Sequence, residues 1–300
     1  MLLPALLLPS LLLPAASRAQ EMEADRFKDV VITRTELGPG LYMLMGAGGN
    51  IVLASGDDGA VLVDDQFAPL TERILASIKE VTDQPVRWVL NTHWHGDHTG
   101  GNEHLGASGA LIVAHQNVRQ RMSTDQVIQA FGRQVPASPD AALPVVTFSE
   151  ELDLHWGGHD IQVRHVAAAH TDGDAMVRFV GQDVLHTGDV YFNGMYPFID
   201  TGSGGGIDGM IAGALLGLSL AGEATKIVPG HGPLSDRDGL QTYVTMLQGV
   251  RDAVGALVKA GETREQIVAA KPSAPWDPTW GGGFMAPDTF VGIVVDGMTR

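Results

Sequence analysis

The alternation of hydrophobic and polar positions predicts two successive blocks of short strands, each accompanied by helices. In the first block we expect strands at residues 30–35, 41–45, 51–55, 60–64, 86–90 and 110–114. Residues 56–59, Gly-Asp-Asp-Gly, are typical of a hairpin turn between the third and fourth of these strands. Apolar residues at helical spacing predict a helix over 69–81, and a polar helical region is expected over 115–129.

The second block repeats this order after a proline-rich loop at 136–144. Strands are expected at 152–156, 160–166, 175–180, 183–186 and 226–228, and helices at 207–221, 240–260 and 262–269. Two similar halves, each a sheet with helices outside, predict an α/β (α+β) fold built as a four-layer sandwich. The functional site of such a fold is expected where the strand ends meet.

The first 19 residues have the features of a signal peptide. Residues 1–14 are almost entirely Leu, Pro and Ala, and Ser17-Arg18-Ala19 places small residues at the positions that a signal peptidase requires. No Lys or Arg precedes this stretch, so a disordered apolar tail is the alternative. From the signal-peptide features we expect a periplasmic or secreted protein without a membrane anchor in its mature form. Its parts would be a leader at 1–19, a catalytic domain at 20–240 and a C-terminal helical segment at 241–300 packed on the same domain.

Composition narrows the chemistry. The chain has 300 residues, of which 44% are hydrophobic, which is ample for a sizeable core. Its net charge of −16 argues against nucleic acid as a partner, because nucleic-acid binding requires a basic face. The chain has no cysteine, which excludes disulfides, thiolate nucleophiles and thiolate metal ligands. Histidine and carboxylate side chains remain as metal ligands.

The segment His93-Trp94-His95-Gly96-Asp97-His98 places four potential metal ligands directly after the predicted strand 86–90. His93 and His95 alternate and can face one metal ion, while Asp97 and His98 can face a second. Imidazole and carboxylate are ligand types that zinc prefers. The alternative is a polar turn that happens to contain three of the 11 histidines.

Three further polar residues follow predicted strands: His170, Asp189 and His231. Taken singly, the two histidines could be core residues with satisfied hydrogen bonds, and Asp189 could form a turn. Their shared placement at strand ends favours a common site with the first cluster.

In this order of ligands the chain resembles the metallo-β-lactamase superfamily, from about residue 30 to residue 233. The resemblance implies an αββα sandwich with two Zn²⁺ ions per chain, although iron or manganese would also suit these ligands. It implies that one metal is held by His93, His95 and His170, the other by Asp97, His98 and His231, and that Asp189 bridges both. Asn50 and Asp64 match positions that shape the floor of the site, with turn formation and capping as their alternative roles.

The implied activity is that of a dinuclear zinc hydrolase acting on a small-molecule substrate. Two divalent ions roughly 3.5–4 Å apart can share a water and lower its pKa toward about 7. The resulting metal-bridging hydroxide would cleave an acyl bond in a neutral or weakly anionic β-lactam, lactone or ester. Asp97 is the candidate catalytic residue, because it can orient the hydroxide or accept its proton.

Several alternatives remain open at this stage. A bridging Asp is more similar to glyoxalase-II-like thioesterases and lactonases than to lactamases, and Phe192 stands where the Cys-type lactamases place a lysine. A non-catalytic periplasmic metal-binding accessory protein is a second alternative, and oxidative chemistry with iron is a third. Seven ligands favour catalysis, because a structural zinc site closes with four.

The aromatic segment 190–198 follows Asp189 directly and is expected to line an apolar pocket. Tyr191, Asn193 or Tyr196 could donate a hydrogen bond to the developing oxyanion. Packing in the core is the alternative for these residues. Near the C-terminus, Trp276, Trp280 and Phe284 could cap the pocket mouth or simply pack on the surface.

Overall fold

A computed structural model describes residues 26–299, so the predicted leader lies outside the described residues. Its larger sheet has seven strands in the order β1-β2-β3-β4-β5-β6-β9. Neighbouring strands are antiparallel from β1 to β4 and parallel from β4 to β9. The strands are β1 Thr33–Gly38, β2 Leu41–Met45, β3 Ile51–Ala54, β4 Ala60–Val63, β5 Val86–Leu90, β6 Leu111–His115 and β9 Val146–Phe148.

The second sheet has five strands in sequence order, β10 to β14. The strands are antiparallel up to β13, and β13 pairs with β14 in parallel. They span β10 Glu151–Trp156, β11 His159–Val166, β12 Asp174–Phe179, β13 Val184–His186 and β14 Lys226–Val228.

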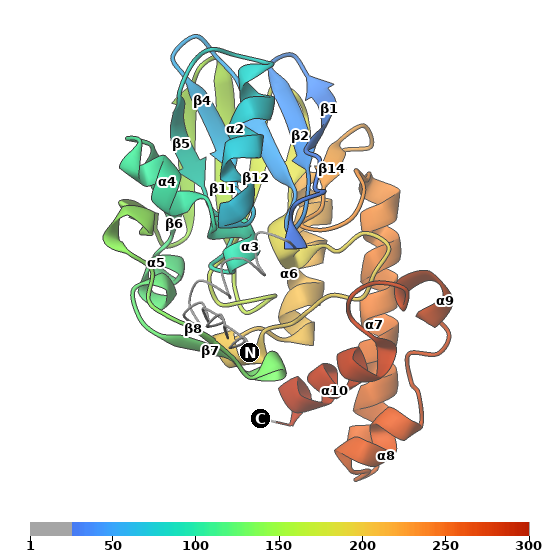
Figure 1. The fold of residues 1–300 in the computed structure, drawn as a ribbon. Helices are drawn as coiled ribbons and strands as arrows, with labels where there is room; N and C mark the ends of the chain where they lie inside the picture. Colours follow the sequence, from blue (N-terminus) through green and yellow to red (C-terminus); the bar gives the residue numbers. More distant parts are fainter. Residues whose placement is uncertain (1–25, 300) are drawn as a thin grey trace, which may run out of the picture.

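The two sheets pack face to face between two layers of helices (Figure 1). Alternate residues of β4 show why: Val61 and Val63 pack in the core between the sheets, whereas Leu62 packs under helix α2. The helices are α2 Thr71–Lys79, α3 Gly96–Thr99, α4 Asn102–Ala107, α5 Gln116–Met122, α6 Ile207–Leu220, α7 Arg237–Lys259, α8 Arg264–Ala269, α9 Asp277–Trp280 and α10 Pro287–Met298. This arrangement confirms the predicted α/β sandwich of four layers.

Several elements differ from the sequence prediction. The helix expected over 115–129 ends at Met122, and the chain then forms a small hairpin of β7 (Gln126–Ile128) and β8 (Arg133–Val135). The sequence did not predict strand β9 or helices α3, α4, α9 and α10. Helix α7 is continuous through residues 240 and 241, and it packs on α6 and α10. Strands β7, β8 and β9 have three residues each, which is too few alternating positions to predict a strand from the sequence.

Among the described residues, no helix is both long enough and apolar enough to cross a membrane.

Candidate metal centre

The loop after β5 and the short helix α3 carry the first cluster of ligands. His95 is the N-cap of α3, and its backbone carbonyl accepts hydrogen bonds from the backbone N–H groups of His98 and Thr99 at 2.9 and 3.1 Å. The Thr99 hydroxyl donates to the same carbonyl at 3.1 Å. This tight turn places His93, His95 and His98 within one buried patch.

The remaining ligands come from the second sheet and meet the first cluster at the same end of the molecule. His170 lies in the turn between β11 and β12, Asp189 lies in the 3-10 turn Gly188–Val190 after β13, and His231 follows β14. The structure thus brings all seven predicted ligands together. Three groups have ligand atoms within 4.8 Å of one another: His93, His95 and His170; Asp97, His98 and His231; and His93, His98 and Asp189.

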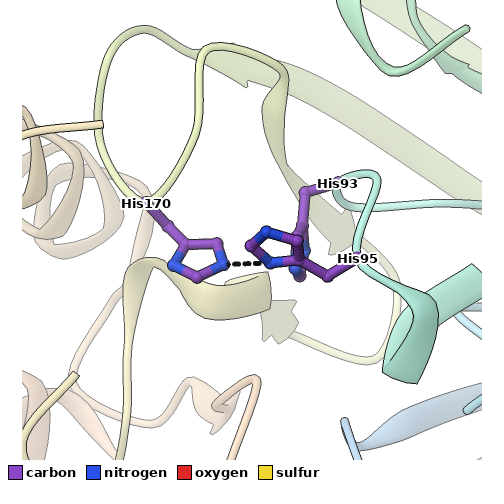
Figure 2. Close-up of side chains that lie close together, drawn as sticks. All are labelled: His93, His95 and His170. Atoms are coloured by element: carbon purple, nitrogen blue, oxygen red, sulfur yellow. Dashed lines mark hydrogen bonds between the residues drawn. The ribbon is translucent and has the colours of Figure 1, made fainter. Parts of the chain in front are cut away.

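The first group is built from three imidazoles. Figure 2 shows His93 and His95 extending from the loop after β5 toward His170, whose Nε2 lies 2.8 Å from His95 Nδ1. The Nε2 atom of His93 is buried and has no hydrogen-bond partner. A buried nitrogen without a partner is costly unless something else binds it. The geometry therefore fits a cation held between these three rings.

The second group consists of two imidazoles and one carboxylate. His98 Nε2 lies 3.3 Å from His231 Nε2, and Asp97 Oδ2 lies 3.4 Å from His231 Nε2 and 3.7 Å from His98 Nε2. Two imidazole nitrogens at this distance and a carboxylate beside them form a set of ligands suited to a divalent cation.

Asp189 lies between the two groups. Its Oδ1 is 3.1 Å from His98 Nε2, and its Oδ2 is 3.3 Å from His231 Nε2 and 3.5 Å from His170 Nε2. One carboxylate is thus close to ligands of both groups, which is the geometry required of a bridging ligand.

Burial and neighbouring charges shift the pKa values of three of the ligands. Burial lowers the pKa of His170 to about 4, so its imidazole is neutral and can offer a lone pair. Burial also disfavours charge on His231, but the carboxylates of Asp189 and Asp97 raise its pKa to about 9. Burial works against ionisation of Asp189 as well, yet His231, His98 and the other imidazoles lower its pKa. Bound cations can take the place of the protons that balance these carboxylates.

Two carboxylates and one backbone carbonyl, hydrogen-bonded to the outer nitrogens of three ligand histidines, fix which ring nitrogen faces the centre. Asp64 Oδ2 lies 2.7 Å from His98 Nδ1, which leaves Nε2 as the ligand atom. Asp200 Oδ2 lies 3.0 Å from His95 Nε2, which leaves Nδ1. His170 Nδ1 lies 2.7 Å from the Phe198 carbonyl oxygen. Asp64 therefore supports the site as the resemblance implied, whereas Asp200 was missed because nothing in its local sequence marks it.

Asn50 acts on the site through the His231 loop. Its side-chain amide donates to the carbonyl oxygens of Pro229 and Gly232 at 2.8 and 2.9 Å, and its backbone N–H donates to Gly230 O at 2.8 Å. These three hydrogen bonds fix the loop on both sides of His231. Asn50 is thus a positioning residue for that ligand.

The centre opens into a cavity of about 440 Å³. Five ligands line it: His95, Asp97, His170, Asp189 and His231. The other lining residues are mainly aromatic or aliphatic, among them Phe67, Trp94, Ile128, Phe131, Phe198 and Phe284. Phe284 takes the position expected of a residue at the pocket mouth, being 59% exposed, whereas Trp280 is buried in the core.

The three polar residues expected to face an oxyanion point elsewhere, and that prediction is corrected. The Tyr191 hydroxyl shares a hydrogen bond with Ser235 Oγ at 2.9 Å, and the Tyr196 hydroxyl donates a hydrogen bond to Asp277 Oδ1 at 2.8 Å. Asn193 donates its amide to the Pro233 carbonyl at 3.0 Å, and none of the three lines the cavity. Both tyrosines are fully buried, because their rings supply core volume under α7 and α10.

Gly49 permits a close approach that the site depends on. A Cβ atom at this position would overlap the His98 ring at Cε1, and the hydrogen bond to Asp64 prevents the ring from moving away. Gly49→Ala is expected to cost about 1–3 kcal/mol of stability from overpacking and to weaken metal binding. Urea unfolding and zinc titration would measure both effects. Gly181→Ala is the control, since its Cβ would meet nothing within 4 Å; equal losses in the two variants would contradict this account.

Comparison with known proteins agrees with this geometry. Residues 45–231 match the family model of the metallo-beta-lactamase superfamily. The chain is 28% identical over 184 residues to a hydroxyacylglutathione hydrolase of Polaromonas sp., covering 61% of each protein. It is 27% identical over 143 residues to the alpha subunit of a 2,4-dinitroanisole O-demethylase of Nocardioides sp., covering 46% of the chain and 40% of that subunit. The chain thus spans less than two thirds of the length of these curated relatives.

Solved structures show the same fold. A metallo-beta-lactamase from Pontibacter korlensis superposes with a TM-score of 0.59 at 23% identity, covering 72% of the chain and 99% of that protein. The sec-alkylsulfatase Pisa1 from Pseudomonas sp. superposes with a TM-score of 0.66 at 17% identity, covering 91% of the chain and 51% of that protein.

Proposed function

Because the chain belongs to the metallo-β-lactamase superfamily, we propose that it is a dinuclear zinc hydrolase that cleaves an acyl bond in a small molecule. A β-lactam, a lactone and an ester are the candidate bonds. The observation that carries the proposal is the position of Asp189 between two groups of three ligands at the floor of a cavity. A purely structural zinc site would need only four ligands and no access to a cavity.

The residues of the chain divide the work of such a reaction. When bound, a pair of divalent cations lowers the pKa of water and polarises the substrate carbonyl. Asp97 lines the cavity with its carboxylate one-quarter exposed, and it is placed to orient the attacking water and accept its proton. Burial disfavours its charge, but His98 and His231 lower its pKa and keep it ionised. The aromatic walls exclude bulk water from the reacting groups.

A thioesterase is the second candidate function. It is supported by the curated relatives named hydroxyacylglutathione hydrolase, which include proteins of Polaromonas and Anaeromyxobacter at 28% and 30% identity.

We also propose that the protein acts in the periplasm or outside the cell, because residues 1–19 have the features of a signal peptide.

Metal analysis and a substrate screen test the proposal together. We expect about two zinc ions per chain after loading, and hydrolysis of at least one compound in a panel of β-lactams, lactones, thioesters and aryl esters. Turnover of thioesters alone would favour the second candidate. One ion per chain with no turnover would instead indicate a metal-binding accessory protein, and no bound ion would contradict the proposal. A coloured, redox-active protein would indicate iron.

Removal of the metals is expected to destabilise the fold. Ligands present at about 1,000 times their Kd stabilise a protein by about 4 kcal/mol, which for a chain of this size corresponds to roughly 10 °C in Tm. Thermal unfolding with and without EDTA, followed by zinc addition, would measure this. Identical melting temperatures in both conditions would argue against metal binding by the seven residues.

A further inference from the structure

The β7–β8 hairpin forms one wall of the cavity above the metal centre. In Figure 1 it lies at the same end of the sheets as α3. At its tip, the ring of Phe131 packs on Phe198 with centroids 4.9 Å apart. Phe198 in turn stacks on His95 with centroids 5.8 Å apart. The hairpin is therefore packed against the residues that surround the ligands, and its side chains lie where a substrate would bind.

Arg133 at the start of β8 brings a positive charge to this wall. Within the described part of the chain, its guanidinium forms no hydrogen bond or ion pair. Arg121, on the neighbouring helix α5, is different: its Nε and Nη2 atoms donate to Asp172 at 2.8 and 2.7 Å. An arginine left without an acid, in a chain of net charge −16, is available to bind an anion that enters the cavity.

Arg26 lines the same cavity from the N-terminal side of the described residues. Its guanidinium carbon lies 4.9 Å from the ring centroid of Phe27 and 5.2 Å from that of Phe67. Contacts with aromatic faces hold an arginine in place without neutralising its charge. The cavity therefore has two cationic side chains set into a mainly apolar wall.

We propose that Arg133 determines specificity by binding the carboxylate of an amphipathic, anionic acyl substrate, with Arg26 adding a second positive charge. An apolar cavity with a few placed polar groups orients a ligand that has an apolar body and a matching charge. This inference rests on the proposed hydrolase function, because it names the substrate class of the same site. It narrows the neutral or weakly anionic substrate expected from the sequence to an anionic one.

Two phenyl esters that differ by one charge test the proposal. Monophenyl glutarate carries a free carboxylate, and methyl phenyl glutarate carries a neutral ester in its place. In the zinc-loaded protein, Arg133→Gln is expected to lower kcat/KM for the anionic ester by about tenfold, mainly through KM, and for the neutral ester far less. Arg133→Lys should retain part of the difference, because it keeps the charge without the planar fork.

Arg87→Gln is the matched control, because Arg87 is an exposed arginine on β5 outside the cavity. It should leave the ratio of the two kcat/KM values unchanged. An equal loss on both esters in Arg133→Gln, or no loss on either, would overturn the proposal.

A binding measurement separates this inference from the hydrolase function. If the wild-type protein hydrolyses neither ester, calorimetric titration with glutaranilic acid, the amide analogue of monophenyl glutarate, still tests whether Arg133 binds a carboxylate. Weaker binding to Arg133→Gln than to the wild type would support the anion site even though these esters are not substrates. Equal affinities, or binding to neither protein, would overturn it.

Discussion

Replacing Asp189 by Ala is expected to lower kcat/KM by about 10³-fold or more, since metal ions contribute several kcal/mol to the transition state and this carboxylate joins their ligands. Asp189 lies within 3.8 Å of nitrogens of four histidines: His93, His98, His170 and His231. Without it, the two ligand groups lose their only shared carboxylate among the described residues. Steady-state kinetics and the zinc content of the purified variant would measure the effect. His95→Ala should give a loss of similar size.

Asp160→Ala provides the control for this variant. Asp160 is an exposed aspartate on β11 whose partner, His155, is also exposed, so the same chemical change is made far from the centre. We expect full activity and two zinc ions in Asp160→Ala, and a native far-UV spectrum in both variants. Undiminished turnover in Asp189→Ala would show that the reaction does not use this site.

The ligands could be predicted from the sequence because each follows a strand. His170, Asp189 and His231 come after β11, β13 and β14, and the cluster from His93 comes after β5. A sandwich of two sheets brings such strand ends to one edge, so local sequence and topology together give the site. This part of the prediction needed no knowledge of side-chain conformation.

The surroundings of the ligands could not be predicted in this way. Asp200 reaches His95 across 105 positions of sequence, and it is set by the turn that follows Phe198 rather than by any strand. Tyr191 and Tyr196 follow Asp189 closely in sequence, yet their rings turn into the core. Arg133 lies on a hairpin whose three-residue strands are too short for a periodic pattern. Such features depend on packing, which is decided by the whole chain.

Replacing Asp64 by Asn is expected to weaken binding of one metal ion by about 10–100-fold, because it changes which nitrogen of His98 carries the proton. Asp64 accepts hydrogen bonds from the Thr92 N–H and hydroxyl, and its Oδ2 lies 2.7 Å from His98 Nδ1. An amide NH₂ in the place of Oδ2 can only donate, so Nδ1 must become an acceptor. The proton then moves to Nε2, the atom that faces His231 and Asp189. Zinc titration against a competing chelator would measure the loss.

Asp65→Asn is the matched control, one residue away. Asp65 is also fully buried, and its Oδ1 accepts a hydrogen bond from the Gly101 N–H at 2.8 Å. Burial and the neighbouring Asp64 raise its pKa, and an amide keeps the oxygen that accepts from Gly101, so Asn should alter little at this position. The backbone of Asp64 has a φ of +61°, a conformation that Asn tolerates well, so Asp64→Asn adds no backbone strain. Equal losses of zinc in the two variants would mean that packing at this strand end, and not the proton on His98, governs the affinity.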